Sequence, residues 1–238
     1  MADPLQDTSV AHRLAAVRAS IETAARRAGR DPAAVRLVAV TKGVQVARIR
    51  EAVAAGQRIF GENRVQELVP KTQELAGEAV VSWHMIGHLQ RNKVRHVVPV
   101  IAMLHSLDRL ELATELDRQL QRIGRRLAVL VEVNTSGEPT KYGVAPEEAA
   151  ELVREAAKLP SLEVSGLMTI GPHTTDQEAV RRAFRLLRQL RDRIREEGAA
   201  GPSFGELSMG MSSDFPIAVE EGATLVRVGT AIFGPRVP

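Results

Sequence analysis

The sequence of 238 residues contains no cysteine, which excludes disulfide bonds and all thiolate chemistry. Aromatic residues make up only 3%, so few side chains are available for stacking against single-stranded nucleic acid. The net charge of +3 is too small to indicate a nucleic acid partner. No apolar run approaches the length of a membrane span, and no signal peptide opens the chain. We therefore expect a cytoplasmic protein that binds neither nucleic acid nor membranes.

Two common motifs of α/β enzymes are also missing. No Gly-x-Gly-x-x-Gly sequence follows the first predicted strand, which counts against a dinucleotide-binding fold. No Gly-x-Ser-x-Gly sequence is present to support a serine hydrolase. His84 and His88 stand four residues apart, but at the end of a predicted strand rather than on a helix, so we expect no metal site. His105 is predicted to be a hydrogen-bonded interior residue.

Strand and helix patterns alternate along the whole chain. The first helix is predicted at residues 8–28, with an apolar face that runs from Val10 to Ile21 and a stop at Gly29. Eight apolar segments are typical of strands, at 36–42, 58–63, 82–87, 103–108, 127–134, 162–170, 206–210 and 225–230. Eight strands separated by helices predict the α/β class and a single (β/α)8 TIM-type barrel.

The predicted barrel accounts for the entire chain. We expect one domain over residues 1–238, in which residues 1–30 form an additional N-terminal helix packed on the barrel. Only eight residues follow Thr230, too few for a full eighth helix. The N-terminal helix is therefore expected to cover the seam between the last strand and the first. An open, doubly wound sheet is the alternative architecture.

Local signals mark the starts of further helices. Asp108-x-x-Glu111 and Thr175-x-x-Glu178 have the spacing of capping boxes, in which each side chain satisfies a free backbone N–H. The basic segment 181–195 has the appearance of a phosphate-binding strip. Because acidic residues interrupt this segment, it is predicted to be a solvated outer helix face.

Lys42 ends the apolar run 36–42, and Gly43 follows at once. Burying an ammonium group without a partner is costly. Desolvation lowers the pKa of a lysine and makes its amine nucleophilic, as Schiff-base chemistry requires. The chain has only five lysines beside a large excess of arginine, which makes this placement unusual. The alternative is a lysine whose side chain extends from the strand end into solvent.

In such barrels the site lies at the C-terminal ends of the strands. Alternation places Lys42 and Arg227 on the inner faces of the neighbouring first and last strands, so two cations are expected to meet there with an anion or acceptor between them. The loops at 210–213 and 229–230 combine glycines with hydroxyl groups, which suits a phosphate, although ordinary turns have the same composition. A reactive amine beside an anion site is what pyridoxal 5′-phosphate (PLP) requires.

A series of short motifs extends in order through nearly the whole chain. They are VAVTK at 38–42, FGEN at 60–63, WHMIGHLQ at 83–90, HSLD at 105–108, VEVN at 131–134, GLM at 166–168, LSMGMS at 207–212 and VRVGT at 226–230. With these motifs the chain resembles the YggS/PROSC family of PLP homeostasis proteins. That family has a single barrel similar to the barrel domain of alanine racemase.

The resemblance implies PLP as the cofactor and a set of residues that bind it. They are Lys42, Asn63, Ser212, Arg227, Gly229 and Thr230. Lys42 would hold PLP as a Schiff base, Asn63 would lie beside the ring and Arg227 would face the pyridine nitrogen. The other three would hold the phosphate. No metal ligand and no catalytic residue are implied.

The function implied by the resemblance is intracellular PLP (vitamin B6) homeostasis without catalytic turnover. The protein would be a monomer, with PLP-dependent apo-enzymes as recipients of PLP. An arginine at the pyridine nitrogen makes the ring a poorer electron sink than a carboxylate does. The competing hypotheses are a PLP-dependent amino-acid racemase and a phosphate-binding barrel enzyme that uses no PLP.

Two residues after the fifth strand have open roles. A racemase of the two-base type needs a second acid or base opposite the lysine. The single tyrosine, Tyr142, is predicted to be a loop anchor or surface residue rather than that group. Lys141 is either a second acceptor, if PLP is passed between sites, or a solvated loop lysine.

Overall fold

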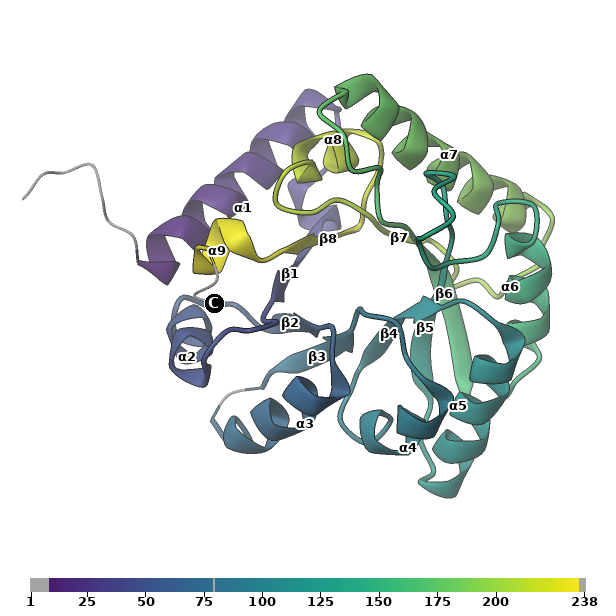
Figure 1. The fold of residues 1–238 in the computed structure, drawn as a ribbon. Coiled ribbons are helices and arrows are strands. Elements are labelled where there is room, and N and C mark those ends of the chain that lie inside the picture. The colour runs from purple at the N-terminus through teal and green to yellow at the C-terminus, as the bar shows by residue number, and fades with distance from the viewer. Residues whose placement is uncertain (1–8, 79, 236–238) are drawn as a thin grey trace, which may run out of the picture.

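Eight parallel strands close into a barrel in chain order, and β8 pairs with β1 (Figure 1). The computed structural model describes residues 9–78 and 80–235. The strands are β1 (Arg36–Val40), β2 (Ile59–Glu62), β3 (Ser82–Met85), β4 (Met103–Leu107), β5 (Leu127–Glu132), β6 (Leu162–Met168), β7 (Glu206–Ser208) and β8 (Leu225–Val228). The predicted (β/α)8 TIM-type barrel is confirmed, and the alternative of an open, doubly wound sheet is wrong.

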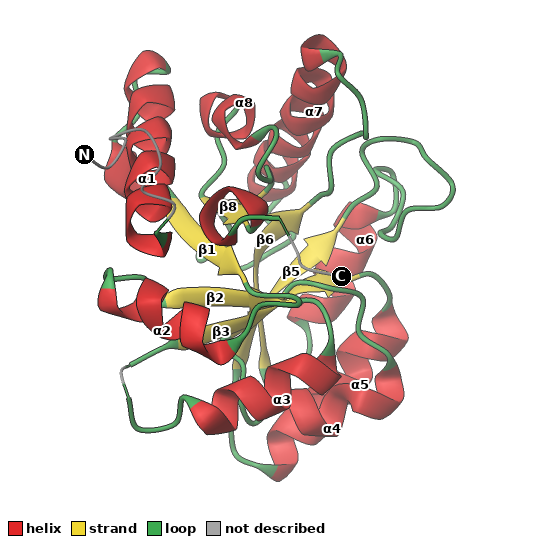
Figure 2. Cartoon of the chain, turned by 60° about the vertical axis from the view of Figure 1, so that its left-hand side comes forward, coloured by secondary structure: helices red, strands yellow, loops and turns green. Residues whose placement is uncertain are grey.

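Helices form the outer layer of the barrel (Figure 2). They are α1 (Val10–Arg27), α2 (Val46–Ala54), α3 (Val65–Glu74), α4 (Val94–Val97), α5 (Leu110–Arg122), α6 (Ala149–Ala157), α7 (Gln177–Glu196), α8 (Phe215–Glu220) and α9 (Thr230–Phe233), with short 3-10 helices at Pro32–Ala34 and Arg91–Lys93. No helix in the ranges 9–78 and 80–235 is long and apolar enough to cross a membrane.

The additional N-terminal helix, α1, packs against α8, α9 and α2 (Figure 1). It therefore lies over the seam between β8 and β1, as predicted. Ser9 caps it, because the Ser9 side chain accepts a hydrogen bond from the backbone N–H of His12 at 3.2 Å. The predicted start at residue 8 lies outside the described residues. At the other end Gly29 takes a φ of 66°, a left-handed conformation that glycine adopts without strain.

The barrel interior holds a small apolar layer that is separate from the main core between strands and helices. Its buried residues are Val38, Met103, Leu130, Met168 and Leu225. Polar side chains share this interior, and His105 is fully buried in it. Its hydrogen bonds confirm the prediction that His105 is a hydrogen-bonded interior residue.

The two predicted capping boxes are wrong in detail. The N-cap of α5 is Arg109, which makes no side-chain capping bond, while Asp108 pairs with Arg109 and His88 instead. The N-cap of α7 is Asp176 rather than Thr175, and its carboxylate accepts hydrogen bonds from two backbone N–H groups of the first turn. A carboxylate at the boundary itself is the better acceptor for these groups.

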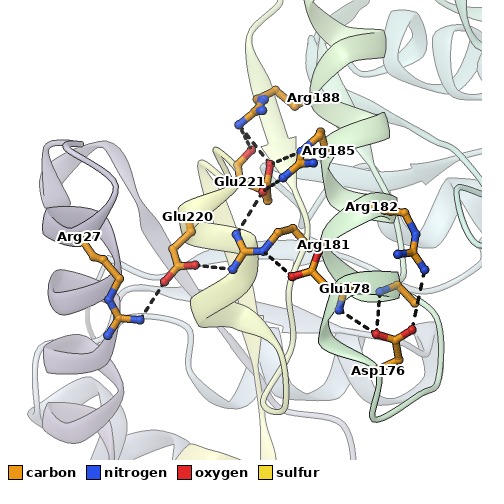
Figure 3. A network of polar contacts seen from close by, with 10 residues as sticks. Arg27, Asp176, Glu178, Arg181, Arg182, Arg185, Arg188, Glu220 and Glu221 are labelled. Carbon is orange, nitrogen blue, oxygen red and sulfur yellow. Dashed lines mark hydrogen bonds and ion pairs between the residues drawn. The ribbon is translucent and has the colours of Figure 1, made fainter.

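The basic segment of α7 joins an ion-pair network with α8 and α1 (Figure 3). Glu221 lies 3.1 Å from Arg181 and 3.0 Å from Arg185. Glu220 lies 2.7 Å from Arg181 and 3.0 Å from Arg27 of α1. Since the side chain of Glu221 is only 4% exposed, these arginines neutralise a buried carboxylate. The segment therefore binds α8 in addition to presenting an outer face to solvent.

Candidate functional site

The C-terminal ends of the strands open into a cavity of about 610 Å³, within the usual size range of small-molecule sites. All six residues predicted to bind the cofactor line it: Lys42, Asn63, Ser212, Arg227, Gly229 and Thr230. The predicted cofactor-binding set did not include several other lining residues, among them Glu132, His88, Tyr142, Met211 and Phe233. The structure thus brings the predicted set together at the expected end of the barrel.

Lys42 follows β1 and is half-buried in the cavity wall. The backbone on both sides of it is tied to side chains. Thr41 is fully buried, and its hydroxyl donates to Glu62 Oε1 at 2.7 Å. The N–H of Gly43 donates to Glu67 Oε2 at 2.7 Å. These bonds fix the direction in which the Lys42 side chain leaves the strand.

Lys71 of α3 completes this arrangement and was not found from the sequence. Its ammonium group donates to the carbonyl oxygen of Thr41 at 2.8 Å, to Glu62 Oε1 at 2.6 Å and to Glu67 Oε2 at 3.0 Å. Desolvation tends to raise the pKa of Glu67, but hydrogen bonds from Gly43 and Lys71 outweigh it and lower that pKa. A buried cation between two carboxylates therefore supports the backbone beneath Lys42.

Arg227 of β8 supplies a fixed cation in the cavity wall. It is 4% exposed, and its Nη1 donates to Ser208 Oγ at 2.6 Å while Nη2 donates to the carbonyl oxygen of Thr169 at 2.8 Å. Burial lowers its pKa to about 10, with Glu132 and Asp214 opposing the shift. Arg227 is thus still a cation at neutral pH. As predicted, Arg227 and Lys42 share one cavity.

Glu132, the last residue of β5, is the acidic group of this cavity. It is 3% exposed, and within the described part of the chain its Oε2 has no hydrogen-bond partner. Desolvation raises its pKa to about 7, and Asp108 adds to the shift while Arg227 opposes it. A buried carboxyl with an unpaired oxygen and a perturbed pKa is typical of a functional site. Its signal in the sequence was a carboxylate at the end of an apolar strand.

The loops after β7 and β8 form a polar corner of the cavity. Ser212 Oγ accepts hydrogen bonds from the N–H groups of Gly229 at 3.3 Å and Ala231 at 3.4 Å. Both bonds are long, so these N–H groups are weakly held. A Cβ on Gly229 would lie 3.3 Å from the carbonyl oxygen of Val40, which favours glycine at this close approach. Backbone N–H groups and a hydroxyl in this arrangement fit a phosphate group.

The loops after β2 and β3 form the opposite wall. A Cβ on Gly87 would lie 2.4 Å from the carbonyl oxygen of Asn63, so the absence of a side chain lets the two loops touch. At the mouth, Tyr142 is 58% exposed and stacks on His88, with ring centroids 4.1 Å apart. His88 Nδ1 lies 3.0 Å from Asp108 Oδ2. Tyr142 therefore lines the cavity from its exposed rim.

Lys141 lies outside the set that lines this cavity. It borders an adjoining cavity of about 750 Å³, which shares Met211 and Ser213 with the first. Its ammonium group donates to Glu138 Oε1 at 2.7 Å and to the carbonyl oxygen of Gly171 at 2.8 Å. Among the residues that the structure describes, no group of three or more acidic or histidine side chains could hold a metal ion.

Comparison with known families gives one match over nearly the full chain. The family model described as alanine racemase, N-terminal domain, matches residues 13–237. A pyridoxal phosphate homeostasis protein from Aquifex aeolicus is 45% identical over 94% of this chain and 97% of its own length. A protein of the same name from Pseudomonas aeruginosa is 43% identical, and the match covers 96% of each chain.

A solved structure with the cofactor present has the same fold. PipY of Synechococcus elongatus, in its PLP-bound structure, superposes with a TM-score of 0.83 at 36% identity, covering 95% of this chain and all of PipY. The cavity described above has the donor groups that PLP needs: an amine, a buried guanidinium and a polar corner suited to phosphate.

Proposed function

Since the chain belongs to the family of pyridoxal phosphate homeostasis proteins, we propose that it binds PLP in the barrel cavity and acts in intracellular vitamin B6 homeostasis. The observation that carries this proposal is the position of Lys42, Arg227 and the Ser212–Gly229 corner around one cavity of about 610 Å³. These groups are an amine, a guanidinium and a polar corner, and each can bind a different polar group of one small ligand. The PLP-bound relative supports the same ligand.

Each group has a distinct part in this proposal. When bound, PLP supplies an aldehyde that a lysine amine can attack. Lys42 supplies that amine, and the bonds that Thr41 and Gly43 donate to two glutamates hold its backbone in position. Arg227 directs an N–H of its guanidinium toward the pyridine nitrogen of PLP. Asn63 lies beside the ring, and the loop containing Ser212, with Gly229 and Thr230, holds the phosphate.

The same arrangement favours holding the cofactor over catalytic turnover. Arg227 keeps its proton at neutral pH, because its pKa of about 10 lies well above that range. A guanidinium in this state donates a hydrogen bond without transferring a proton to the ring. The named relatives are called pyridoxal phosphate homeostasis proteins. We propose accordingly that the protein is non-catalytic, monomeric and cytoplasmic, and that PLP-dependent apo-enzymes receive PLP from it.

One observation favours a second candidate, a PLP-dependent amino-acid racemase. Glu132 lines the cavity that contains Lys42, and its pKa of about 7 allows it to take up and release a proton near neutrality. Incubating the PLP-loaded protein with amino acids in deuterated water separates the two functions. A carrier leaves the α-proton in place, whereas a racemase exchanges it for deuterium at a rate that depends on Lys42.

The binding function is tested by loading the wild type and Lys42→Ala with PLP, followed by desalting and absorbance. Borohydride reduction and peptide mass spectrometry then locate the attached cofactor. Lys158→Ala, at an exposed lysine paired with Glu155, is the matched control. We expect retained PLP in the wild type and the control, attached at Lys42, and loss in Lys42→Ala. Attachment at another lysine, or no retention by the wild type, would contradict the proposal.

A further inference from the structure

A chain of hydrogen bonds crosses the barrel interior and ends at Arg227. His84 Nδ1 lies 2.9 Å from His105 Nε2, and His105 Nδ1 lies 2.8 Å from Ser208 Oγ. Ser208 Oγ in turn accepts from Arg227 at 2.6 Å. The four residues come from β3, β4, β7 and β8, and all are at most 4% exposed. Of the four, only Arg227 lines the cavity.

One arrangement of donors and acceptors gives the Ser208 hydroxyl proton an acceptor among the described residues. Arg227 has N–H groups and no acceptor, so Ser208 Oγ must accept from it. In that arrangement the single hydroxyl proton of Ser208 goes to His105 Nδ1, which is then unprotonated. His105 therefore carries its proton on Nε2 and donates it to His84 Nδ1. His84 in turn holds its proton on Nε2.

Both imidazoles are held in the neutral state that this order requires. Burial lowers the pKa of His84 to about 4, and the charge of Arg36 adds to the effect. Burial is also the main cause that lowers the pKa of His105 well below its usual range, and His84, Arg227 and Arg36 add to the shift. A proton on His105 Nδ1 would reverse its bond to Ser208 and leave the Ser208 hydroxyl proton without its acceptor in this chain.

The guanidinium of Arg227 is thereby held at two points. One terminal nitrogen donates to Ser208 Oγ and the other to the carbonyl oxygen of Thr169 at 2.8 Å. Each terminal nitrogen carries a second N–H beside the one used here. Two anchors fix the plane of the group and therefore the direction of those remaining N–H bonds. The bond between Ser208 Oγ and His105 restrains the Ser208 side chain and therefore the position of the oxygen that anchors one nitrogen of Arg227.

We propose that His84 and His105 are positioning residues, which act through Ser208 to aim Arg227 at the ring nitrogen of the bound cofactor. The inference rests on the proposed function, in which PLP occupies the cavity. Neither histidine touches the cavity, so their effect on binding is carried by Arg227 alone. If the two histidines only stabilised the barrel, replacing them would change by the same factor the affinities for ligands that differ at the ring nitrogen.

Two variants of His84 separate these roles. His84→Asn places an amide oxygen where Nδ1 accepts from His105, whereas His84→Leu has a similar size and no acceptor. The ligands are PLP and an analogue in which carbon replaces the pyridine nitrogen. We expect the wild type to bind PLP more tightly than the analogue. His84→Leu should weaken PLP binding on the order of tenfold, the size expected for a misaligned bond to a charged group, and leave the analogue unaffected. His84→Asn should retain the preference for PLP.

Nitrogen NMR of the imidazoles in the wild type gives a readout that needs no ligand. We expect both histidines to be neutral with the proton on Nε2 at pH 7. A charged His105, or a proton on its Nδ1, would overturn the inference even if His84→Leu did not fold. Equal weakening for both ligands in His84→Leu, or none, would overturn it and leave PLP binding intact. Failure of the wild type to bind PLP would instead overturn the proposed function, and this inference with it.

Discussion

Lys71 and Glu62 form an ion pair of 2.6 Å directly beneath the backbone that presents Lys42, and their side chains are 9% and 0% exposed. Because Lys71 also donates to the carbonyl oxygen of Thr41, the pair joins α3 to the end of β1. For the proposed attachment of PLP, Lys42 needs a rigid backbone, and the bonds of Lys71 to Thr41 and Glu62 provide that rigidity. Lys71 thus supports the backbone, whereas Lys42 lines the cavity.

Replacing Lys71 with methionine should strongly destabilise the protein. Removing one partner of a buried ion pair leaves the other charge uncompensated, at a cost of about 3–5 kcal/mol. Urea denaturation of Lys71→Met measures this loss. The double variant Lys71→Met, Glu62→Gln should recover part of it, because no buried charge is then left at Glu62. Lys158→Met, at an exposed lysine, should change stability little. Similar losses of stability in Lys71→Met and Lys158→Met would contradict the argument that the buried ion pair stabilises the protein.

Glu132 should make stability fall as pH rises. Its pKa of about 7 in the folded state exceeds the unfolded value of about 4.3. The folded state therefore binds the proton more tightly, and this contribution is complete below about pH 4.3 and lost as the pH passes 7. Glu132→Gln removes the effect. Relative to the wild type, the stability of Glu132→Gln should increase by about 3 kcal/mol between pH 4 and pH 8.

Denaturation series at several pH values test this prediction. Glu163→Gln, at an exposed position of β6, is the control and should not follow the same curve. A stability difference between wild type and Glu132→Gln that stays constant from pH 4 to pH 8 would show that the carboxyl does not titrate near 7.

The barrel could be predicted because its signals are local. Each strand is a short apolar run, and helical periodicity separates the runs. The six cofactor-binding candidates come from the family resemblance, and they line one cavity because strand ends in a barrel converge at one rim. Helix starts are harder to predict, because Asp176 and Thr175 are both candidate caps for the same N–H groups. Residue spacing alone does not distinguish two candidate N-caps that are one position apart.

The remaining parts of the site depend on packing between distant segments. Lys71 reads as an ordinary lysine on α3, and only the fold brings it to Thr41, 30 residues earlier in the chain. The shift at Glu132 comes from desolvation, which no sequence pattern contains. The protons between Arg227 and His84 can be assigned only from three distances, which join residues of four different strands.

Gly87→Ala should disturb the wall that contains Asn63. The new Cβ would lie 2.4 Å from the carbonyl oxygen and 2.8 Å from the Cα of Asn63. Since both are backbone atoms, the loop must move, at a cost of about 1–3 kcal/mol. Thermal denaturation and PLP binding measure the effect. Gly205→Ala is the control, because nothing lies within 4 Å of its Cβ. Equal behaviour of the two variants would contradict this close approach.

Glu221→Gln should weaken the junction of α7 and α8 at neutral pH (Figure 3). Desolvation tends to raise the pKa of Glu221, but hydrogen bonds from Arg185 and Arg181 outweigh it and lower that pKa. Its ionised form therefore contributes stability above the unfolded pKa of about 4.3, and this is lost as the pH falls through the folded value.

Melting temperatures at pH 7 and at pH 3 measure the effect of Glu221→Gln. The gap between wild type and variant should be wide at pH 7 and narrow in acid. Glu178→Gln, whose exposed carboxylate lies 3.9 Å from Arg181, should show a small gap at both pH values. A gap for Glu221→Gln that widens in acid would contradict the stated direction.

Ser212→Ala should weaken PLP binding through the phosphate alone. The Ser212 hydroxyl accepts long hydrogen bonds from Gly229 and Ala231, and its own O–H would donate a hydrogen bond to a bound phosphate. Loss of one hydrogen bond to a charged group costs about 1.5–3 kcal/mol, or roughly tenfold or more in affinity. Pyridoxal, which has no phosphate, should bind the variant and the wild type equally. Lys42→Ala is the contrasting variant and should weaken binding of both compounds. If Ser212→Ala weakens PLP and pyridoxal by the same factor, then the corner near Gly229 does not hold the phosphate.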